Sequence, residues 1–285
     1  MEQEYKKVLQ EKLLEMAKYL DSFCKENGIE YYIAGGNCLG ALRHKGFIPW
    51  DDDFDVMMTM DNYTKFCKAC ETKLDKKYSH QSIDNDPNYH LNFSKLRDNT
   101  TTFVEEASMD RNLNNYGIYI DIFQIAGVPE GKWHRKMQNI YRTAAISCYI
   151  NIFNNKIVKN AFELICKIVG KRRVQKFCRK KAERYSCETS KEWYTVYDTF
   201  PYNRCVAPKE YFGKPTYVPY EDTMLPVPEK ADLYLRIMYG DYMQIPSQEE
   251  IKKCEHTPYI LDVNRPFTDY MENSKFIKYK KREKE

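Results

Sequence analysis

The segment from residue 51 to 58, DDDFDVMM, constrains the fold more than any other part of the chain. Asp53–Met57 alternate polar and apolar residues, and this period of two predicts a β-strand. On such a strand Asp53 and Asp55 point to one side, about 6–7 Å apart, while Phe54 and Val56 point into the core. Two carboxylates held in this way can bind a hard divalent cation, or two cations bound to a phosphate.

A second predicted strand, residues 117–125 (GIYIDIFQI), carries a single acid, Asp121, amid apolar neighbours. A carboxylate in that setting is costly to bury unless it meets a metal ion or a hydrogen-bond donor. If this strand lies beside residues 53–57, then Asp53, Asp55 and Asp121 come together on one face of a sheet. The sequence therefore predicts a metal site that holds a pyrophosphate.

A Gly-Gly turn precedes these acids. Gly35 and Gly36 follow a predicted strand at Ile29–Ala34 and open a predicted short helix over residues 37–44, with Asn37 as its N-cap. Glycines at such a turn let backbone N–H groups and the helix N-terminus approach a phosphate. We expect the turn to contact the phosphate from the side opposite the metal.

Cations near the acids are candidates for binding the phosphate and neutralising its charge. Arg43 and Lys45 lie at the far end of the predicted helix, and Lys95 and Arg97 alternate on a further predicted strand. The alternative for Lys95 and Arg97 is an exposed sheet edge, where charged side chains are common.

The acidic run has simpler interpretations. DDDFD by itself is more often a hydrated turn than a metal site, and Asp51 and Asp52 could cap the loop or pair with Arg43. An EF-hand would need a central glycine and a terminal glutamate, which are missing. Cys67 and Cys70 lie on a predicted helix without a second cysteine pair, so a zinc site is rejected.

The charge of the chain is unevenly distributed. The net charge is +4, yet residues 131–185 hold fifteen Lys or Arg and only two acids, Glu163 and Glu183. This block predicts a basic surface that meets an anion, although an ordinary solvated helix surface would look similar. It includes an apolar stripe, with Ile157, Phe162 and Ile165 among its members, that we expect to face the core. Docking on an anionic glycolipid or membrane surface is the alternative.

The remaining sequence predicts an α/β protein with a mixed sheet in its first half and mostly helices and loops after it. We expect a catalytic core at 1–130, a basic helical segment at 131–200, and loops and helices at 201–285 that complete the site. The first 28 residues predict an amphipathic helix and not a signal peptide, and no apolar run is long enough to span a membrane. With ten scattered cysteines, these features predict a cytoplasmic protein.

The ordered motifs resemble those of the LicD family of phosphorylcholine transferases, which includes the fukutin-related proteins. The resemblance is carried by GGNCLGALRHKGFIPWDDDFDVMM (35–58), KLRDNTT (95–101), GIYIDIF (117–123), YVPYEDTMLPVP (217–228) and YLRIMYGDYMQIP (234–246), followed by His256. Two positions depart from the family pattern. Asn37 replaces the usual Thr, and Gln124 stands where Pro is common.

The resemblance implies a nucleotidyltransferase-like fold, a mixed β-sheet flanked by helices. It implies transfer of a phospho-alcohol, usually phosphocholine from CDP-choline, to a sugar hydroxyl of a surface glycan such as teichoic acid or lipopolysaccharide, with release of CMP. The family motif maps onto Gly35, Gly36, Asp53, Asp55 and Asp121 as turn glycines and ligands of Mg²⁺ or Mn²⁺. His256 is a candidate binding residue by its position alone.

A choline group would favour an aromatic cage. Candidate walls are Tyr116, Tyr119, Tyr239 and Tyr242. Near them, Gly240 is interpreted either as a helix C-cap or, with Asp241, as part of the site.

Two alternatives to this activity stay open. One is nucleotidyl transfer to a small acceptor, and the other is a non-catalytic protein that binds anionic glycan or membrane. Nucleic acid is not an expected partner, because the basic block lacks a recognisable reading motif.

Overall fold

The computed structural model describes residues 2–150, 152–153, 155–197, 200–253, 258–272 and 275–276. Its α-helices are α1 (Glu2–Glu26), α2 (Gly35–His44), α3 (Met60–Lys73), α4 (Lys132–Ser147), α5 (Lys156–Val169), α6 (Lys171–Ala182), α7 (Lys209–Phe212), α8 (Ala231–Tyr239) and α9 (Gln248–Lys253). Short 3-10 helices occur at Glu106–Arg111, Tyr202–Arg204 and Phe267–Tyr270.

The strands form one main sheet and several small ribbons. They are β1 (Tyr32–Ile33), β2 (Asp55–Thr59), β3 (Tyr78–Gln81), β4 (Ser94–Asp98), β5 (Thr102–Val104), β6 (Tyr119–Gly127), β7 (Glu192–Thr195), β8 (Val206–Pro208), β9 (Thr216–Tyr220), β10 (Thr223–Val227), β11 (Ile260–Asp262), β12 (Met271–Glu272) and β13 (Lys275–Phe276). The main sheet has the order β1-β2-β6-β4-β3, and β7 pairs with both β6 and β8. In this sheet β2 and β6 run parallel and the other described pairs run antiparallel. The predicted α/β class with a mixed sheet is confirmed.

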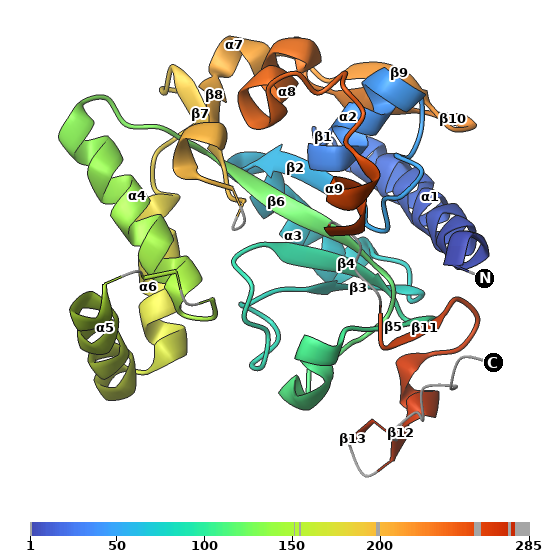
Figure 1. Cartoon of the computed structure of the whole chain (residues 1–285), viewed down its shortest axis with the longest axis horizontal. Coiled ribbons are helices and arrows are strands. Elements are labelled where there is room, and N and C mark those ends of the chain that lie inside the picture. Colours follow the sequence, from blue (N-terminus) through green and yellow to red (C-terminus); the bar gives the residue numbers. More distant parts are fainter. Residues whose placement is uncertain are drawn as a thin grey trace.

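Helices α1 and α3 cover one face of the main sheet (Figure 1). The apolar side of α1 is almost completely buried, as the sequence predicted, and Phe23 of α1 meets Phe66 of α3 edge-on. Helices α2 and α8 pack against each other beside β2. A large part of the core therefore lies between the sheet and the two helices α1 and α3. The ends of β2 and β6 that lie near α2 are available for a site.

Several predicted element boundaries differ from the structure. The strand expected at residues 29–34 is reduced to β1, and β2 begins at Asp55 instead of Asp53. Strand β5 pairs with β11 outside the main sheet, while β3 and β7 were not predicted. Strand β3 reads YSHQ, which lacks a continuous apolar pattern, so its pairing with β4 was not visible in the sequence.

Helices α4, α5 and α6 form a helical arm at one side of the sheet (Figure 1). The segment predicted to be helical at 131–200 holds the three helices α4, α5 and α6, but it also contains β7, so the prediction is wrong for its last part. Helices α4 and α6 enclose a small core of Ala145, Cys148, Val174 and Cys178. The apolar stripe of α5 was expected to face the core, and that prediction is wrong. None of the residues of α5 is buried, because only Phe162 and Cys166 pack against the arm's core.

Within the part of the chain that the structure describes, no helix combines the length and the apolar character needed to cross a membrane.

Candidate active site

The carboxylates predicted to form a site converge on one cavity. Parallel pairing sets Asp55 of β2 directly opposite Asp121 of β6, and Asp53 lies two residues before the start of β2. All three line a cavity of about 660 Å³. The intervening Phe54 and the following Val56 are buried on the core side. The predicted convergence of Asp53, Asp55 and Asp121 is thereby confirmed, whereas their chemical roles stay a prediction.

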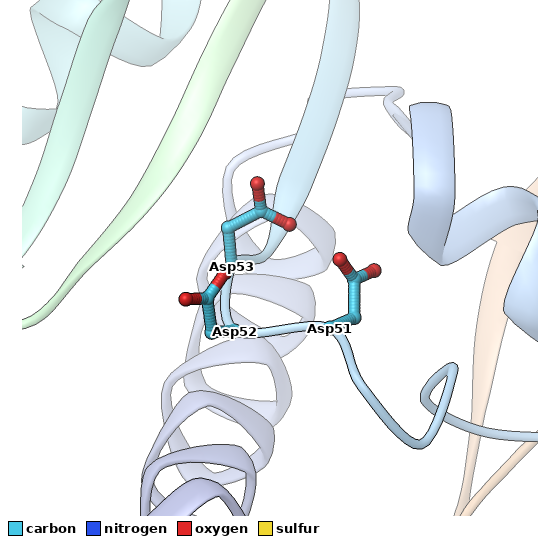
Figure 2. Close-up of side chains that lie close together, drawn as sticks. All are labelled: Asp51, Asp52 and Asp53. Atoms are coloured by element: carbon cyan, nitrogen blue, oxygen red, sulfur yellow. The ribbon is translucent and has the colours of Figure 1, made fainter. Parts of the chain in front are cut away.

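A fourth carboxylate, Asp51, lines the same cavity and was not among the predicted site residues. Asp51, Asp52 and Asp53 each offer one oxygen within 4.8 Å of the others. Figure 2 shows that the carboxylates of Asp51 and Asp53 point to the same side of the segment leading into β2. The signal was present in the sequence, because the alternation of Asp53 and Asp55 extends backward to Asp51.

The two glycines of the turn make room for these carboxylates. A Cβ atom at Gly35 would lie 3.0 Å from Oδ2 of Asp55, and one at Gly36 would lie 2.7 Å from Oδ2 of Asp51. Gly35 also has a φ of +50°, which side chains other than glycine rarely adopt. Helix α2 begins at Gly35, so its first N–H groups and the positive end of its dipole lie beside the acids.

Asn37 does not cap α2 as predicted. The N-cap is Ala34, and the Asn37 side chain is fully buried inside the first turn. Its Oδ1 accepts a hydrogen bond from the Asp55 N–H at 2.6 Å, and its Nδ2 donates to the Asp53 carbonyl at 3.3 Å. Asn37 therefore holds the backbone that carries the acids, and it does not line the cavity.

Asp51 and Asp55 have raised pKa values because they share a buried space with other acids. Burial first, and then repulsion by Asp53 and Asp121, raise the pKa of Asp55 well above its ordinary value. Burial and repulsion by Asp53 do the same to the pKa of Asp51. Asp51, Asp53, Asp55 and Asp121 crowd one part of the cavity, which Asp241 and Glu250 also line, and a bound divalent cation would relieve the repulsion among the four. Their hard oxygen donors fit Mg²⁺ or Mn²⁺.

Lys95 partly compensates the acidic charge. Its Nζ lies 2.5 Å from Oδ1 of Asp121 and 3.2 Å from the centre of the Tyr119 ring. Burial raises the pKa of Asp121, although Lys95 opposes this shift, and burial lowers the pKa of Lys95. This ion pair orients the Asp121 carboxylate at the edge of the cavity.

The other predicted cations are placed differently. Lys95 and Arg97 are each 4% exposed on β4, an internal strand between β6 and β3, so the exposed-edge interpretation is wrong. Arg97 binds Gln81 and the Gly117 carbonyl and does not line the cavity. Lys45 is exposed, ends α2 with a φ of 60°, and also lies outside the cavity lining.

Arg43 does line the cavity. Its Nη1 donates to the carbonyls of Tyr242 at 2.6 Å and Gln244 at 3.2 Å, and so ties α2 to the segment after α8. This contact replaces the pairing with Asp51 or Asp52 that the sequence left open.

The rest of the cavity wall is largely aromatic. Its aromatic residues are Trp50, Phe93, Phe123, Tyr197, Phe200, Tyr239 and Tyr242. Tyr239 and Tyr242 were predicted. Tyr116 belongs to a separate small core, and Tyr119 lies beneath Lys95 outside the cavity lining. Gly240 is the C-cap of α8, with a φ of 71° and a ψ of −125°, and Asp241 lines the cavity, whereas a role of this segment in the reaction stays a prediction.

Two further predictions concern possible ligands elsewhere. His256 lies outside the described residues. Cys67 and Cys70 are on α3, as predicted. Neither belongs to the group of Asp51, Asp52 and Asp53 that precedes β2.

Comparison with known proteins gives a consistent result. Residues 28–146 match the family described as LicD/FKTN/FKRP, nucleotidyltransferase domain. The chain is 26% identical over 263 residues to the lipopolysaccharide cholinephosphotransferase LicD of Haemophilus influenzae, a match that covers 84% of this chain and 91% of that protein. A stretch of 50 residues is 38% identical to the ribitol 5-phosphate transferase FKRP of Mus musculus, and it covers 18% of this chain and 10% of that protein.

Proposed function

The chain belongs to the LicD/FKTN/FKRP nucleotidyltransferase domain family, and from this premise we propose that it transfers a phospho-alcohol from a CDP-alcohol to a glycan hydroxyl. The preferred donor is CDP-choline, and the acceptor is a cell-surface glycan or its lipid-linked precursor. The acceptor oxygen forms a bond to the phosphorus that carries the alcohol. The bond from that phosphorus to the bridging oxygen breaks, and CMP leaves with the bridging oxygen and its electron pair.

One observation carries the proposal: Asp53, Asp55 and Asp121 meet beside the Gly-Gly start of α2, inside the region that matches the family. The printed names of two relatives support the reaction class, because one is a cholinephosphotransferase and the other a ribitol 5-phosphate transferase. They differ in the alcohol transferred, so the choice of phosphocholine rests on the longer match.

Asp53, Asp55 and Asp121, with Asp51 beside them, would hold Mg²⁺ or Mn²⁺. When bound, the ion would supply Lewis-acid stabilisation of charge on the donor pyrophosphate. The N-terminus of α2 is suited to bind a phosphate through its free N–H groups. Asp121, oriented by Lys95, is placed to accept the proton of the acceptor hydroxyl, and its raised pKa suits a general base.

The second half of the chain contributes to the same site. Tyr239, Asp241 and Tyr242 line the cavity, and Arg43 binds the segment that carries them. The aromatic wall would accommodate a quaternary ammonium by cation–π contacts. We assign catalysis to residues 1–130, completion of the site to residues 201–285 together with Tyr197 and Phe200, and contact with the membrane that carries the acceptor to the helices of residues 131–200.

The test is a product assay combined with thermal stabilisation. The protein is incubated with Mg²⁺ and CDP-choline, CDP-ribitol or CTP, together with a glycan acceptor, and CMP and pyrophosphate are measured. We expect CMP from a CDP-alcohol, and the same donor should raise Tm by mass action. Pyrophosphate from CTP would identify a nucleotidyltransferase instead. No Tm shift with any CDP compound, and no product, would contradict the proposal.

A further inference from the structure

Helix α5 exposes a continuous apolar face. Seven residues fall on one side of the helix at about 3.6 residues per turn: Ile157, Val158, Ala161, Leu164, Ile165, Ile168 and Val169. Ile157 is 79% exposed, Ile168 75% and Leu164 57%. A patch of this kind normally marks a surface that binds a partner or a membrane.

The arm holds this face outward. Phe162 and Cys166, on the adjacent part of α5, pack against the arm's core, so the exposed residues cannot turn inward without breaking that contact. The Asn155 side chain caps the start of the helix by accepting from the N–H groups of Ile157 and Val158. Arg172, just after α5, donates to the backbone carbonyls of Asp86, Pro87 and Tyr89 and so attaches the arm to the core.

Exposed cations border the apolar face. Lys156 begins α5, Lys167 lies on its polar side, and Lys171 and Arg173 follow its end. Helix α5 contains one acid, Glu163, whose carboxylate lies 3.7 Å from Lys159. An apolar face bordered by lysines and arginines matches an anionic lipid surface, with side chains entering the acyl region and cations meeting the headgroups. A second copy of the chain would bring the same cations against one another, so lipid is the favoured occupant.

From this combination we propose that α5 lies in the surface of an anionic membrane and anchors the helical arm there. This inference does not depend on the donor or the metal, because the arm lies apart from the carboxylate cavity. It would place the catalytic core beside a lipid surface, where a lipid-linked acceptor would be found.

The experiment is vesicle flotation of the full chain. Vesicles of equal parts phosphatidylglycerol and phosphatidylcholine are compared with vesicles of phosphatidylcholine alone. We expect binding to the anionic vesicles, weakened by salt, and at least about 10-fold weaker binding by the variant Ile157→Gln, Leu164→Gln, Ile168→Gln. The matched control, Val8→Gln, Met224→Gln, Leu233→Gln, changes exposed apolar residues elsewhere and should bind like the unmodified chain.

A charge variant, Lys156→Glu, Lys171→Glu, Arg173→Glu, should also lose binding to anionic vesicles. Circular dichroism and the turnover of a water-soluble acceptor should stay unchanged in both arm variants, because neither touches the cavity. Equal flotation of the unmodified chain and the apolar triple variant would overturn the proposal, as would no flotation at all. Light scattering that shows a dimer, returned to a monomer by the triple variant, would identify a second copy as the occupant and would also overturn it.

Discussion

The carboxylate site and the helical arm use charge in opposite ways. The site concentrates Asp51, Asp53, Asp55 and Asp121 in a buried cavity with Lys95 as a neighbouring cation. The arm spreads lysines and arginines over exposed helices with few acids. Burial makes each charge in the cavity strongly dependent on its neighbours, whereas water screens the charges of the arm. The comparison teaches that single substitutions should have large effects in the site and small effects in the arm.

The largest effect is expected from Asp55→Asn. The variant keeps the shape of the side chain and removes one charge from the predicted metal site, so kcat should fall at least about 10³-fold. Folding should be retained, because the substitution relieves repulsion among buried acids. Asp61→Asn, at an exposed acid of α3, is the matched control and should leave kcat unchanged. Normal turnover by Asp55→Asn would remove the site from the reaction.

The next largest effect concerns stability. Lys95→Met leaves the Asp121 carboxylate buried without its cation and should lower the free energy of unfolding by about 3–5 kcal/mol in urea titrations. The double variant Lys95→Met, Asp121→Asn should recover most of this loss. Lys18→Met breaks an exposed ion pair with Asp222 of similar length and should cost less than about 1 kcal/mol. A double variant as unstable as the single one would mean that Lys95 acts through packing.

The pH dependence of stability sharpens the contrast further. The pKa of Asp55 is higher in the folded chain than in the unfolded chain. As pH falls, the folded chain therefore binds this proton first, and the binding stabilises the metal-free fold relative to the unfolded chain. Burial lowers the pKa values of His80 and His90 to about 4, so these groups act in the opposite direction below neutral pH. The difference between the unmodified chain and Asp55→Asn isolates the carboxylate.

On acidification from neutral pH in EDTA, Tm of Asp55→Asn should therefore fall more steeply than Tm of the unmodified chain. One proton of difference changes the free energy of unfolding by about 1.4 kcal/mol per pH unit. Saturating Mg²⁺ should reduce the difference in slope, because the ion favours the ionised acid. Parallel curves in EDTA would show that the pKa of Asp55 is not raised.

A smaller effect is expected at the turn. Gly35→Ala and Gly28→Ala both place a side chain at positive φ, +50° and +64°. A Cβ at Gly28 meets nothing within 4 Å, whereas one at Gly35 meets Asp55. Both variants should be destabilised by about 1–2 kcal/mol, and of the two only Gly35→Ala should lose turnover. Thermal unfolding and product assays check this, and equal turnover in the two variants would show that the carboxylate has room to move.

The smallest effect is expected in the arm. Ile168→Gln replaces a side chain that is 75% exposed and should change the free energy of unfolding by less than about 0.5 kcal/mol. Ile146→Gln, at a buried position of α4, is the comparison and should be strongly destabilising. Clear destabilisation by Ile168→Gln in urea titrations would mean that α5 is covered in solution.

Much of the site could be predicted because its signals are local. The alternation at Asp53 and Asp55 determines their shared side, and a lone acid in an apolar strand indicates Asp121. Lys45 and Arg97 were assigned to the site because they are near the acids in sequence or share a strand face with Lys95. Lys45 lies outside the site because the backbone turns left-handed at the end of α2, and Arg97 lies outside it because it binds Gln81 and Gly117. Neither feature is visible in the local sequence pattern.

The sequence by itself determined the α/β class, the Gly-Gly turn, the spacing of the acids and the helical nature of the arm, because each depends on residues close together in the chain. Tertiary structure alone decided that β2 and β6 pair in parallel with Asp55 opposite Asp121, that Asp51 joins them, and that Asn37 supports the backbone of the acids. It also decided that α5 leaves its apolar face uncovered. Periodicity shows that a helix has an apolar face, but whether that face is buried depends on which distant elements pack against it.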